Sequence, residues 1–374
     1  MFSLHVDTAR TWRGGQNQVL LTVTGLRAIG HRAALVAHPE GELYRRAAEG
    51  LDLVPLAPKS EVDLSAAWRL SRLVRRLRPD LVHAHDPHGV AMAALALSMI
   101  PSGPTPAFLV SRRVDFHFKA NSLSRWKHRQ VDCFVAASEA IRQLLLADGV
   151  PSERTVTVHE GIDVDHVRAA PAVNVHEVLW LPHHAPLIVN VAALVPHKGQ
   201  RYLIEAAPLV LRQVPDARIV IFGEGELRAH LEHLVREHHA EKHVLLPGFR
   251  ADILGCIKGA DLFVLCSVTE GLGTSLLDAM ACQKAVVATR AGGIPEVVED
   301  RTTGLLVPPR DATALAQAIV DLIRDDARRQ QMGDAGLARV CSRFTVERMV
   351  TETVAVYERV MGSRLKASGS GLRA

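Results

Sequence analysis

Short apolar runs alternate with segments of helical period along almost the whole chain. Strands that alternate with helices in this way form parallel sheets with helices on both faces. The runs are continuously apolar, which is typical of strands that are covered on both sides. In the first half the pattern predicts strands at residues 2–6, 33–37, 51–56, 81–84, 107–110, 133–136 and 155–158, with helices such as 16–29 and 64–78 between them.

Three prolines and two histidine-rich patches interrupt the alternation at residues 168–186, after which it restarts. We therefore predict an α/β chain with two doubly wound, Rossmann-like domains in tandem. Ligands bind at the carboxyl ends of parallel strands, so we expect the site in a cleft between two facing domains. The predicted domains are 1–170 and 171–344, followed by a helix at 345–362 and a flexible tail at 363–374. Strands of the second domain are predicted at 187–192, 217–222, 243–246, 262–265, 285–288 and 305–307, and helices at 200–214, 226–238 and 275–281.

The composition is that of a globular protein, with 48% hydrophobic and 22% charged residues among 374. This excludes a disordered tail protein, a collagen-like chain and a small disulfide-stapled scaffold. The apolar run at 90–100 is far shorter than the roughly 20 residues that a membrane span needs, and no secretory leader is visible. Five cysteines without a Cys-x-x-Cys pair fit buried thiols in a reducing compartment, so we expect a cytoplasmic protein.

The net charge of +4 is too small to indicate nucleic-acid binding, and an aromatic content of 4% does not support stacking platforms for single strands. Residues 1–170 contain 21 basic and 17 acidic residues, so the positive surplus belongs to the first predicted domain. The 19 histidines are scattered, and the pairs at 183–184 and 238–239 lack a third ligand at zinc spacing. We read the histidines as mostly solvated, and we predict no metal site and no nucleic-acid partner.

A loop suited to phosphate follows the predicted strand at 262–265. Gly271 and Gly273, with Leu272 between them, allow the backbone to approach a ligand closely. A helix begins near Thr274, and the free amides at a helix start bind phosphate groups.

Two carboxylates flank this loop. Glu270 would repel a phosphate, so it is better suited to hydrogen-bonding hydroxyls or to answering positive charge that develops on a sugar ring. Asp278 lies about one turn into the helix, where it could reach a vicinal diol such as a ribose. The alternative is a plain strand-to-helix turn that Glu270 caps.

A second loop of this kind ends in Pro-His-Lys-Gly before the helix predicted at 200–214. A lysine at a helix start is unfavourable for the helix dipole unless it serves an anion, so Lys198 is a candidate diphosphate ligand. A third loop, Gly223-Glu-Gly, resembles half of a Gly-x-Gly fingerprint, although a simple turn explains it equally well.

The first half has its own candidates. The adjacent glycines Gly14 and Gly15 follow the first strand and open a helix, and His85 lies just past the fourth strand, where an acid/base or hydrogen-bonding histidine would lie. A structural role for a strand-end histidine is the alternative. Asp163-Val-Asp165 matches a metal-binding pattern of some transferases, but the pattern is short and lies in the loop that leaves the first domain, so we assign it no metal.

Together these stretches resemble the retaining glycosyltransferases of family 4, whose GT-B fold has two facing Rossmann-like domains. The likeness runs in order from about residue 4 to residue 345. Each motif alone is weak evidence for this family, whereas the whole series in this order is specific evidence for it. The matching stretches are Gly14-Gly15, His-Ala-His85, Ser138-Glu-Ala-Ile-Arg142, Glu160-Gly-Ile-Asp163, Pro196-His-Lys-Gly199, Gly223-Glu-Gly225, Pro247-Gly-Phe-Arg250, Glu270-Gly-Leu-Gly with Leu-Leu-Asp278-Ala-Met-Ala-Cys, and Gly292-Gly-Ile-Pro-Glu296.

The resemblance implies a role for each matching position. The candidate catalytic residues are Glu270, which would contact the donor sugar, His85 near the reacting sugar, and Lys198 on the diphosphate. The candidate donor-binding residues include Asp278 for the ribose, Phe249 and Arg250 beside the base, Gly15 over the diphosphate and acceptor, and the loop residues Gly223, Gly271, Leu272, Gly273 and Thr274.

The sequence departs from the family pattern at three positions. Asp278 stands where a glutamate is usual, so we expect re-angled or weakened ribose binding. Ala193 stands where an arginine is common, which leaves the diphosphate charge to the loop lysine and helix dipoles, with help from Arg250 or Arg290. Glu160 replaces a common asparagine.

The implied activity is retaining, metal-independent transfer of a sugar from a nucleotide-diphosphate donor, preferably UDP-linked, with no further cofactor. The implied acceptor is a glycan or a lipid-linked glycan, as in cell-envelope or lipopolysaccharide synthesis. A sugar-nucleotide 2-epimerase of the same architecture and a non-catalytic nucleotide-sugar-binding subunit remain as alternatives.

One basic stretch bears on where in the cell the protein is found. Residues 112–129 carry six Lys/Arg and one Asp, with Phe116, Phe118 and Trp126 interleaved. Cationic side chains mixed with aromatic ones suit an anionic membrane surface, so a peripheral location on the inner face of the membrane is one expectation. A solvated basic loop and helix with its aromatic residues in the core is the other.

Overall fold

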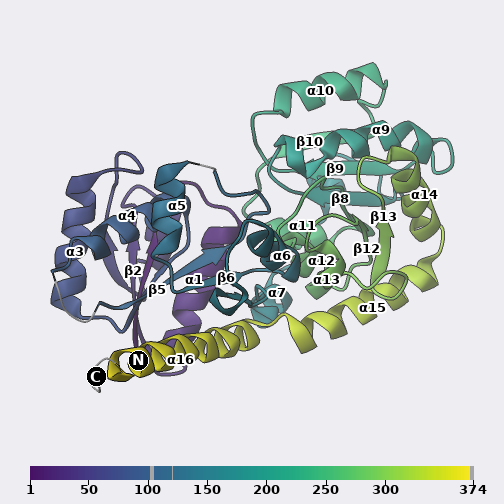
Figure 1. Ribbon diagram of the computed structural model, residues 1–374. Coiled ribbons are helices and arrows are strands. Elements are labelled where there is room, and N and C mark those ends of the chain that lie inside the picture. The colour runs from purple at the N-terminus through teal and green to yellow at the C-terminus, as the bar shows by residue number, and fades with distance from the viewer. Residues whose placement is uncertain (102–104, 120, 371–374) are drawn as a thin grey trace. The chain divides into compact units, whose positions relative to one another are not determined.

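The computed structural model describes residues 1–374 except 102–104, 120 and 371–374. It divides into two compact units, which are described separately here (Figure 1). Unit 1 comprises Met1–Gly161 and Val346–Ala374, and unit 2 comprises Ile162–Thr345. The first crossing between units therefore precedes the predicted boundary at residue 170, and the C-terminal helix belongs to the first unit.

The sheet of unit 1 is parallel throughout the described residues, in the order β3-β2-β1-β4-β5-β6-β7. The chain builds outward from β1 to β3, then returns to β4 on the other side of β1. In open α/β sheets ligands bind where the strand order reverses, which here is at the carboxyl ends of β1 and β4. The strands are β1 (Phe2–Asp7), β2 (Arg32–Ala37), β3 (Asp52–Pro55), β4 (Leu81–Ala84), β5 (Ala107–Arg112), β6 (Cys133–Ala136) and β7 (Thr155–Thr157).

Helices cover both faces of this sheet (Figure 1). The third, fourth and sixth helices pack on one face, and the first, second and last pack on the other. Burial of Tyr357 anchors the last helix to the sheet through a hydrogen bond to His83. The helices are α1 (Gly14–Ala28), α2 (Glu42–Ala47), α3 (Leu64–Leu77), α4 (Pro87–Ser98), α5 (Ser122–Arg129), α6 (Glu139–Ala147), η1 (Ser152–Arg154) and α16 (Val346–Ser370).

Unit 2 has a parallel sheet in the order β10-β9-β8-β11-β12-β13 among the residues described. Its order reverses between β8 and β11, so the loops that follow these two strands are where a ligand is expected to bind. The residues of β11 and β12 are all buried, as are all but one in each of β8 and β9, which explains why these inner strands read as apolar runs. The strands are β8 (Leu187–Val191), β9 (Arg218–Phe222), β10 (Val244–Gly248), β11 (Leu262–Leu265), β12 (Val286–Thr289) and β13 (Gly304–Val307).

The helices of unit 2 also form two layers on the sheet. One layer packs around Ile204 and Ile319, and the other around Met280 and Phe344. The helices of unit 2 are α7 (Val164–Ala169), α8 (Val175–Val178), η2 (Pro196–Lys198), α9 (Gln200–Leu211), α10 (Arg228–Glu237), α11 (Ile253–Lys258), α12 (Thr274–Ala281), α13 (Ile294–Val297), α14 (Ala312–Ile323) and α15 (Asp326–Arg343).

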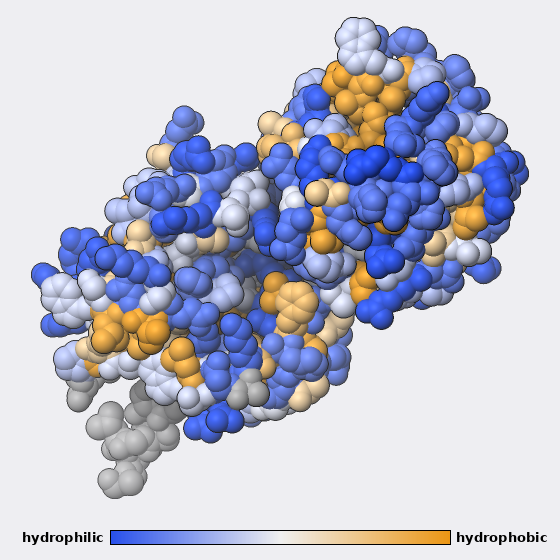
Figure 2. Space-filling model, turned by 90° about the horizontal axis from the view of Figure 1, so that it is seen from above, coloured by the Kyte–Doolittle hydropathy of each residue, from blue (hydrophilic) through white to orange (hydrophobic). Residues whose placement is uncertain are grey.

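The surface is mostly hydrophilic, and its hydrophobic side chains form separate patches on the face that Figure 2 shows. Among the described residues, no helix is both long and apolar enough to cross a bilayer. Four of the five cysteines are buried free thiols, whereas Cys341 is exposed.

One prediction needs correction. The tail predicted as flexible from residue 363 continues α16 as far as Ser370, because Arg364 is held by Asp132 (2.8 Å) and by the carbonyl oxygen of Pro106 (2.7 Å). Residues 371–374 of that tail lie outside the described residues. Most histidines are at least partly exposed, as predicted, whereas His5, His83 and His85 are buried together.

Candidate functional site

An ion pair joins the loop after β8 to the loop after β11 in unit 2. Lys198, at the end of η2 after β8, donates to both carboxylate oxygens of Glu270, which follows β11, at 2.8 and 2.7 Å. Ser267 donates a further hydrogen bond to Glu270 Oε2 at 2.8 Å. Both charged side chains are largely buried, with 20% and 10% exposure. Two of the three candidate catalytic residues therefore lie in direct contact.

Glycines let neighbouring loops support this pair. A Cβ on Gly292, after β12, would lie 1.8 Å from the carbonyl oxygen of Glu270, and the Gly293 amide donates to that same oxygen at 3.0 Å. Gly223, after β9, has a φ of 136°, and a Cβ there would lie 2.0 Å from the carbonyl oxygen of Ala192 after β8. Close backbone approach, rather than a turn alone, requires glycine at these positions.

The start of α12 offers backbone donors beside Glu270. Its N-cap is Gly273 in the left-handed region (φ 97°), and no side chain caps the helix. The first amides of an uncapped helix are free to bind an anion. A Cβ on Gly273 would lie 3.6 Å from Glu270 Cγ, so the carboxylate side chain and the helix start are neighbours. Gly271 and Leu272, which precede this N-cap, are buried, and Thr274 is half-buried.

Asp278 lies on the first turns of α12 and is half-buried. Its carboxylate forms no hydrogen bond with any described residue, so it retains its full capacity to accept one. Burial raises the pKa of Asp278 from 3.8 to about 7, because the charged form loses solvation.

The two residues expected beside the base, Phe249 and Arg250, differ in how available they are to a ligand. Phe249 is 62% exposed, as a stacking residue would be. Arg250 instead donates to both oxygens of Asp252, at 2.8 and 2.6 Å, and Arg290 is paired with Asp300 at 2.5 Å. The two arginines expected to help with the diphosphate charge are therefore each paired with a carboxylate, as Lys198 is.

In unit 1, His85 and Gly15 both lie against Arg113, which follows β5. Arg113 Nη1 is 3.1 Å from His85 Nδ1, and Arg113 Nε is 2.9 Å from a carboxylate oxygen of Glu160. A Cβ on Gly15 would lie 3.7 Å from Arg113 Cδ. Arg113 is 15% exposed, and its Nη2 forms no hydrogen bond with any described residue. The sequence reading missed this arginine.

Two of the three buried histidines, His85 and His5, form a chain of hydrogen bonds with a single direction. Arginine only donates, so His85 Nδ1 accepts, and a neutral His85 carries its proton on Nε2, which lies 2.9 Å from His5 Nδ1. The His5 Nε2 proton then points to Ser3 Oγ, 3.0 Å away.

A second branch of contacts runs through Ser111. Ser111 Oγ lies 3.1 Å from His85 Nδ1 and 2.9 Å from His83 Nε2. His83 Nδ1 lies 2.6 Å from the Tyr357 hydroxyl. Serine and tyrosine hydroxyls donate or accept, so the arginine assigns the neutral Nε2–H tautomer to His85 and His5, and His83 is joined to them through Ser111.

Electrostatics agree with neutral rings. Burial, helped by the charge of Arg113, lowers the pKa of His5 to about 3 and holds the pKa values of His83 and His85 well below 6.5. The three rings offer nitrogen atoms within 4.8 Å of one another, as metal ligands would. Hydrogen bonds already occupy those nitrogens and a guanidinium lies beside them, so we assign the cluster to the protein framework rather than to a metal.

A second residue that the sequence reading missed is Asp7, at the end of β1. It is buried, and it accepts from the Ala9 amide at 3.1 Å and from Gln16 Nε2 at 3.2 Å. Burial and the nearby Asp86 raise the pKa of Asp7 to about 7. Asp7 therefore ties the turn at Gly15 to the sheet while remaining able to exchange a proton near neutrality.

Comparison with known families identifies the class of protein. The family model described as Glycosyltransferase Family 4 matches residues 12–166, and the model described as Glycosyl transferases group 1 matches residues 174–339. The chain belongs to this glycosyltransferase family.

Relatives and solved structures point the same way. The chain is 28% identical to EpsD of Bacillus subtilis, named as a glycosyltransferase, over 82% of this chain and 83% of the relative. It is 26% identical to N-acetyl-alpha-D-glucosaminyl L-malate synthase of Bacillus anthracis, over 80% of both chains. HepE of Anabaena, solved with UDP-glucose, matches with a TM-score of 0.83 at 21% identity, over 95% of this chain and 100% of that one. The fold is GT-B, with two Rossmann-like α/β units.

Proposed function

We propose that this glycosyltransferase uses a nucleotide-diphosphate sugar as donor, retains the anomeric configuration and needs no metal ion. The observation that carries the proposal is the Lys198–Glu270 pair beside the uncapped start of α12. This arrangement places one cation, one carboxylate and free amides at the carboxyl edge of a single sheet. A diphosphate linked to a sugar presents the matching groups.

The chemistry follows from these charges. Lys198 and the first amides of α12 stabilise negative charge as the bond between the anomeric carbon and the diphosphate oxygen breaks. Glu270 faces the positive charge that develops on the sugar ring. The acceptor oxygen forms the new bond on the same face, and its proton passes to the departing phosphate oxygen. Asp278 accepts hydrogen bonds from the ribose hydroxyls.

In unit 1 we assign the substrate contact to Arg113, and His85 to a positioning role. Protein groups occupy both ring nitrogens of His85, whereas Arg113 keeps Nη2 for a ligand. Glu160 neutralises the guanidinium, so a hydroxyl suits it better than a second phosphate.

A UDP-sugar is our preferred donor, because HepE, a structural neighbour, was solved with UDP and with UDP-glucose. For the acceptor we propose a glycan or lipid-linked glycan of the cell envelope, including lipopolysaccharide. Four buried free thiols support a reducing, cytoplasmic location.

The basic stretch at 112–129 is only partly available to a membrane. Phe118 stacks on the His128 ring with a centroid distance of 3.8 Å, and Lys127 is buried and paired with Glu61 at 3.2 Å. Phe116 and Trp126 are 49% and 37% exposed. Residue 120 lies outside the described residues. The stretch therefore presents a smaller surface than the sequence suggests.

A thermal-shift screen of UDP-, GDP- and ADP-sugars tests the proposal, because a bound donor stabilises the folded state by mass action. The stabilising donor is then incubated with and without candidate acceptors, and the product is examined by NMR. An α-linked product from an α-linked donor is expected. A new epimer formed from donor alone would show a 2-epimerase, and binding without any turnover would show a non-catalytic subunit.

A further inference from the structure

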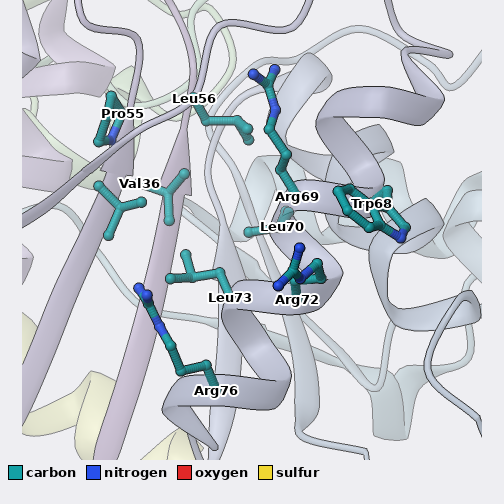
Figure 3. A pocket seen from close by; sticks show the side chains of 10 residues that line it. Val36, Pro55, Leu56, Trp68, Arg69, Leu70, Arg72, Leu73 and Arg76 are labelled. Atoms are coloured by element: carbon teal, nitrogen blue, oxygen red, sulfur yellow. The ribbon is translucent and has the colours of Figure 1, made fainter.

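The chain leaves unit 1 at Gly161, a few residues after the last strand of that sheet. Because β7 ends at Thr157, the buried backbone of Gly161 lies outside the described sheet. A buried amide and a buried carbonyl group each need a hydrogen-bond partner from elsewhere. By contrast, the groove in Figure 3, between α3 and the edge of the same sheet, is lined by side chains such as Leu56 and Leu70 that already belong to the core.

Gln18 supplies both partners for this backbone. Its side chain comes from the second turn of α1. Gln18 Nε2 donates to the Gly161 carbonyl oxygen at 2.9 Å, and Gln18 Oε1 accepts from the Gly161 amide at 3.2 Å. The side-chain amide therefore pairs with the main chain as a neighbouring strand would. Gln18 is 2% exposed, so both hydrogen bonds form in a site of low dielectric constant, where the loss of either partner is costly.

The helix with which the chain returns to unit 1 is held at the same place. Met349 of α16 has its Sδ 3.3 Å from the Gly161 amide nitrogen and 3.9 Å from Thr22 Oγ1. Thr22 lies one turn beyond Gln18 on α1 and donates to the Gln18 carbonyl oxygen at 2.7 Å. The helix α1 therefore holds both the segment by which the chain leaves unit 1 and the helix by which it returns.

The residue before Gly161 contacts the candidate site. A carboxylate oxygen of Glu160 lies 2.9 Å from Arg113 Nε, and Arg113 Nη1 lies 3.1 Å from His85 Nδ1. A guanidinium is planar and rigid, so contacts at two of its nitrogen atoms fix the direction of the third, Nη2. The position of Glu160 is therefore one of the two contacts that orient the group assigned to the substrate.

We propose that Gln18 is a positioning residue for sugar transfer, which holds Glu160 in place through Gly161 and thereby orients Arg113 Nη2 toward the substrate. This inference rests on the proposed function, in which Arg113 contacts the substrate. Without the Gln18 amide, the peptide between Glu160 and Gly161 is free to rotate, and the guanidinium loses one of its two contacts. A purely structural role for Gln18 predicts lower stability with an unchanged Arg113.

Nitrogen-15 NMR of protein with labelled arginine reports on Arg113 without any substrate. The Arg113 Nε–H signal is identified by its absence in Arg113→Lys. Because this group lies against Glu160, its proton is expected to exchange slowly with water in the unmodified chain. In Gln18→Met, which keeps the length of the side chain but not its amide, exchange is expected to be at least tenfold faster. Gln18→Asn keeps the amide on a side chain one methylene shorter, and a smaller increase is expected.

The matched control is Thr353→Val, which removes another buried hydrogen bond of unit 1, from Thr353 Oγ1 to the Met349 carbonyl oxygen at 2.7 Å. Its Arg113 Nε–H exchange rate is expected to stay within twofold of the unmodified chain. Circular dichroism and urea unfolding show that each variant is folded and how much stability it has lost, and Gln18→Asn carries the test if Gln18→Met does not fold. Equal exchange rates in the Gln18 variant and in the control would overturn the proposal.

Transfer kinetics test the consequence, with the donor and acceptor found in the incubation described above. In Gln18→Met we expect the KM for acceptor to rise at least threefold and the KM for donor to stay within twofold. If Gln18 acts through Glu160, the double variant Gln18→Met, Glu160→Gln has the same acceptor KM as Glu160→Gln alone. Additive effects of the two substitutions would overturn the proposal. An unchanged acceptor KM in Arg113→Met would instead contradict the proposed function, while the exchange rate would still decide the role of Gln18.

Discussion

The burial of Asp278, which we propose binds the ribose, lowers the stability of the folded chain when the carboxyl group is charged. Its pKa is raised from 3.8 to about 7 by burial, so the folded chain holds a proton that the unfolded chain has lost between these pH values. The contribution of this group to the free energy of unfolding therefore falls as pH rises from about 4 to about 7.

Asp278→Asn removes this penalty. We expect the variant to be more stable than the unmodified chain by about 1–3 kcal/mol at pH 8 and equally stable at pH 4. Urea unfolding at pH 4, 6 and 8 measures the difference, with the exposed Asp216→Asn as control. Asp7 titrates in the same direction but is common to all chains compared. No gain at pH 8 would show that the carboxyl is not destabilised by its surroundings.

Arg113 sets the tautomers of two buried histidines. Because it can only donate, we expect His85 and His5 to carry their proton on Nε2, and we expect all three rings to stay neutral below pH 6.5, where an exposed histidine becomes charged. Nitrogen-15 NMR of labelled histidines reads the tautomer directly.

In Arg113→Met we expect His85 to lose this fixed tautomer, and the KM for acceptor to rise more than the KM for donor. Arg113→Lys is expected to restore the charge but not the simultaneous contacts with His85 and Glu160, giving partial rescue. An Nδ1–H signal from His85 in the unmodified chain would contradict the assignment.

At the scale of elements, the loops of unit 2 interlock through backbone contacts. Gly292→Ala drives a Cβ to 1.8 Å from the Glu270 carbonyl oxygen, at a φ of 50°. We expect a loss of roughly 1–3 kcal/mol in stability, the usual cost of overpacking or of backbone strain, together with weaker donor binding.

Gly15→Ala is the matched comparison, because its Cβ would meet nothing closer than Arg113 Cδ at 3.7 Å. We expect its stability to change by less than about 0.5 kcal/mol. Denaturant unfolding of both variants measures the contrast. Similar stabilities for the two variants would mean that the loops after β11 and β12 can move apart at little cost.

The sheets were predictable because their strands are buried on both faces. A strand such as β11 therefore reads as a short unbroken apolar run, and it was predicted with its observed bounds at 262–265. Every predicted strand has a counterpart, with ends displaced by at most two residues. Helix ends were less certain, since α9 stops at Leu211 rather than at residue 214.

The parts that the sequence did not reveal depend on contacts between distant residues. Lys198 and Glu270 were each singled out from their loops, but their pairing became visible only when β8 and β11 were seen as neighbours. His5 and His85 come from two adjacent strands separated by 80 residues of sequence, so no spacing rule could join them.

The return of α16 to unit 1 was missed for the same physical reason. Its apolar face predicts a packed helix, but nothing in that face specifies which of two hydrophobic cores it joins. The choice is made by buried contacts such as Tyr357 with His83 and Met349 with Thr22.

At the scale of the whole molecule, we expect transfer without a metal ion. Lys198 and the free amides of α12 can neutralise a departing diphosphate, and the Asp163-Val-Asp165 pattern is remote in sequence from them, with Asp163 acting as the N-cap of α7. Activity is expected to remain within about twofold in EDTA. Loss of activity in EDTA with rescue by Mn²⁺ would contradict this expectation.

The central claim is that the loops after β8 and β11 hold a nucleotide-sugar donor. Titration calorimetry with the donor found by the screen tests it directly, in the unmodified chain and in Lys198→Ala, Glu270→Gln and the exposed control Lys242→Ala. We predict one binding site, at least tenfold weaker binding in Lys198→Ala, as loss of a charged hydrogen bond of about 1.5–3 kcal/mol implies, and unchanged binding in the control. We predict that Glu270→Gln still binds donor but turns it over at least a hundredfold more slowly. No binding of any nucleotide sugar, or equal binding by Lys198→Ala and Lys242→Ala, would contradict the account.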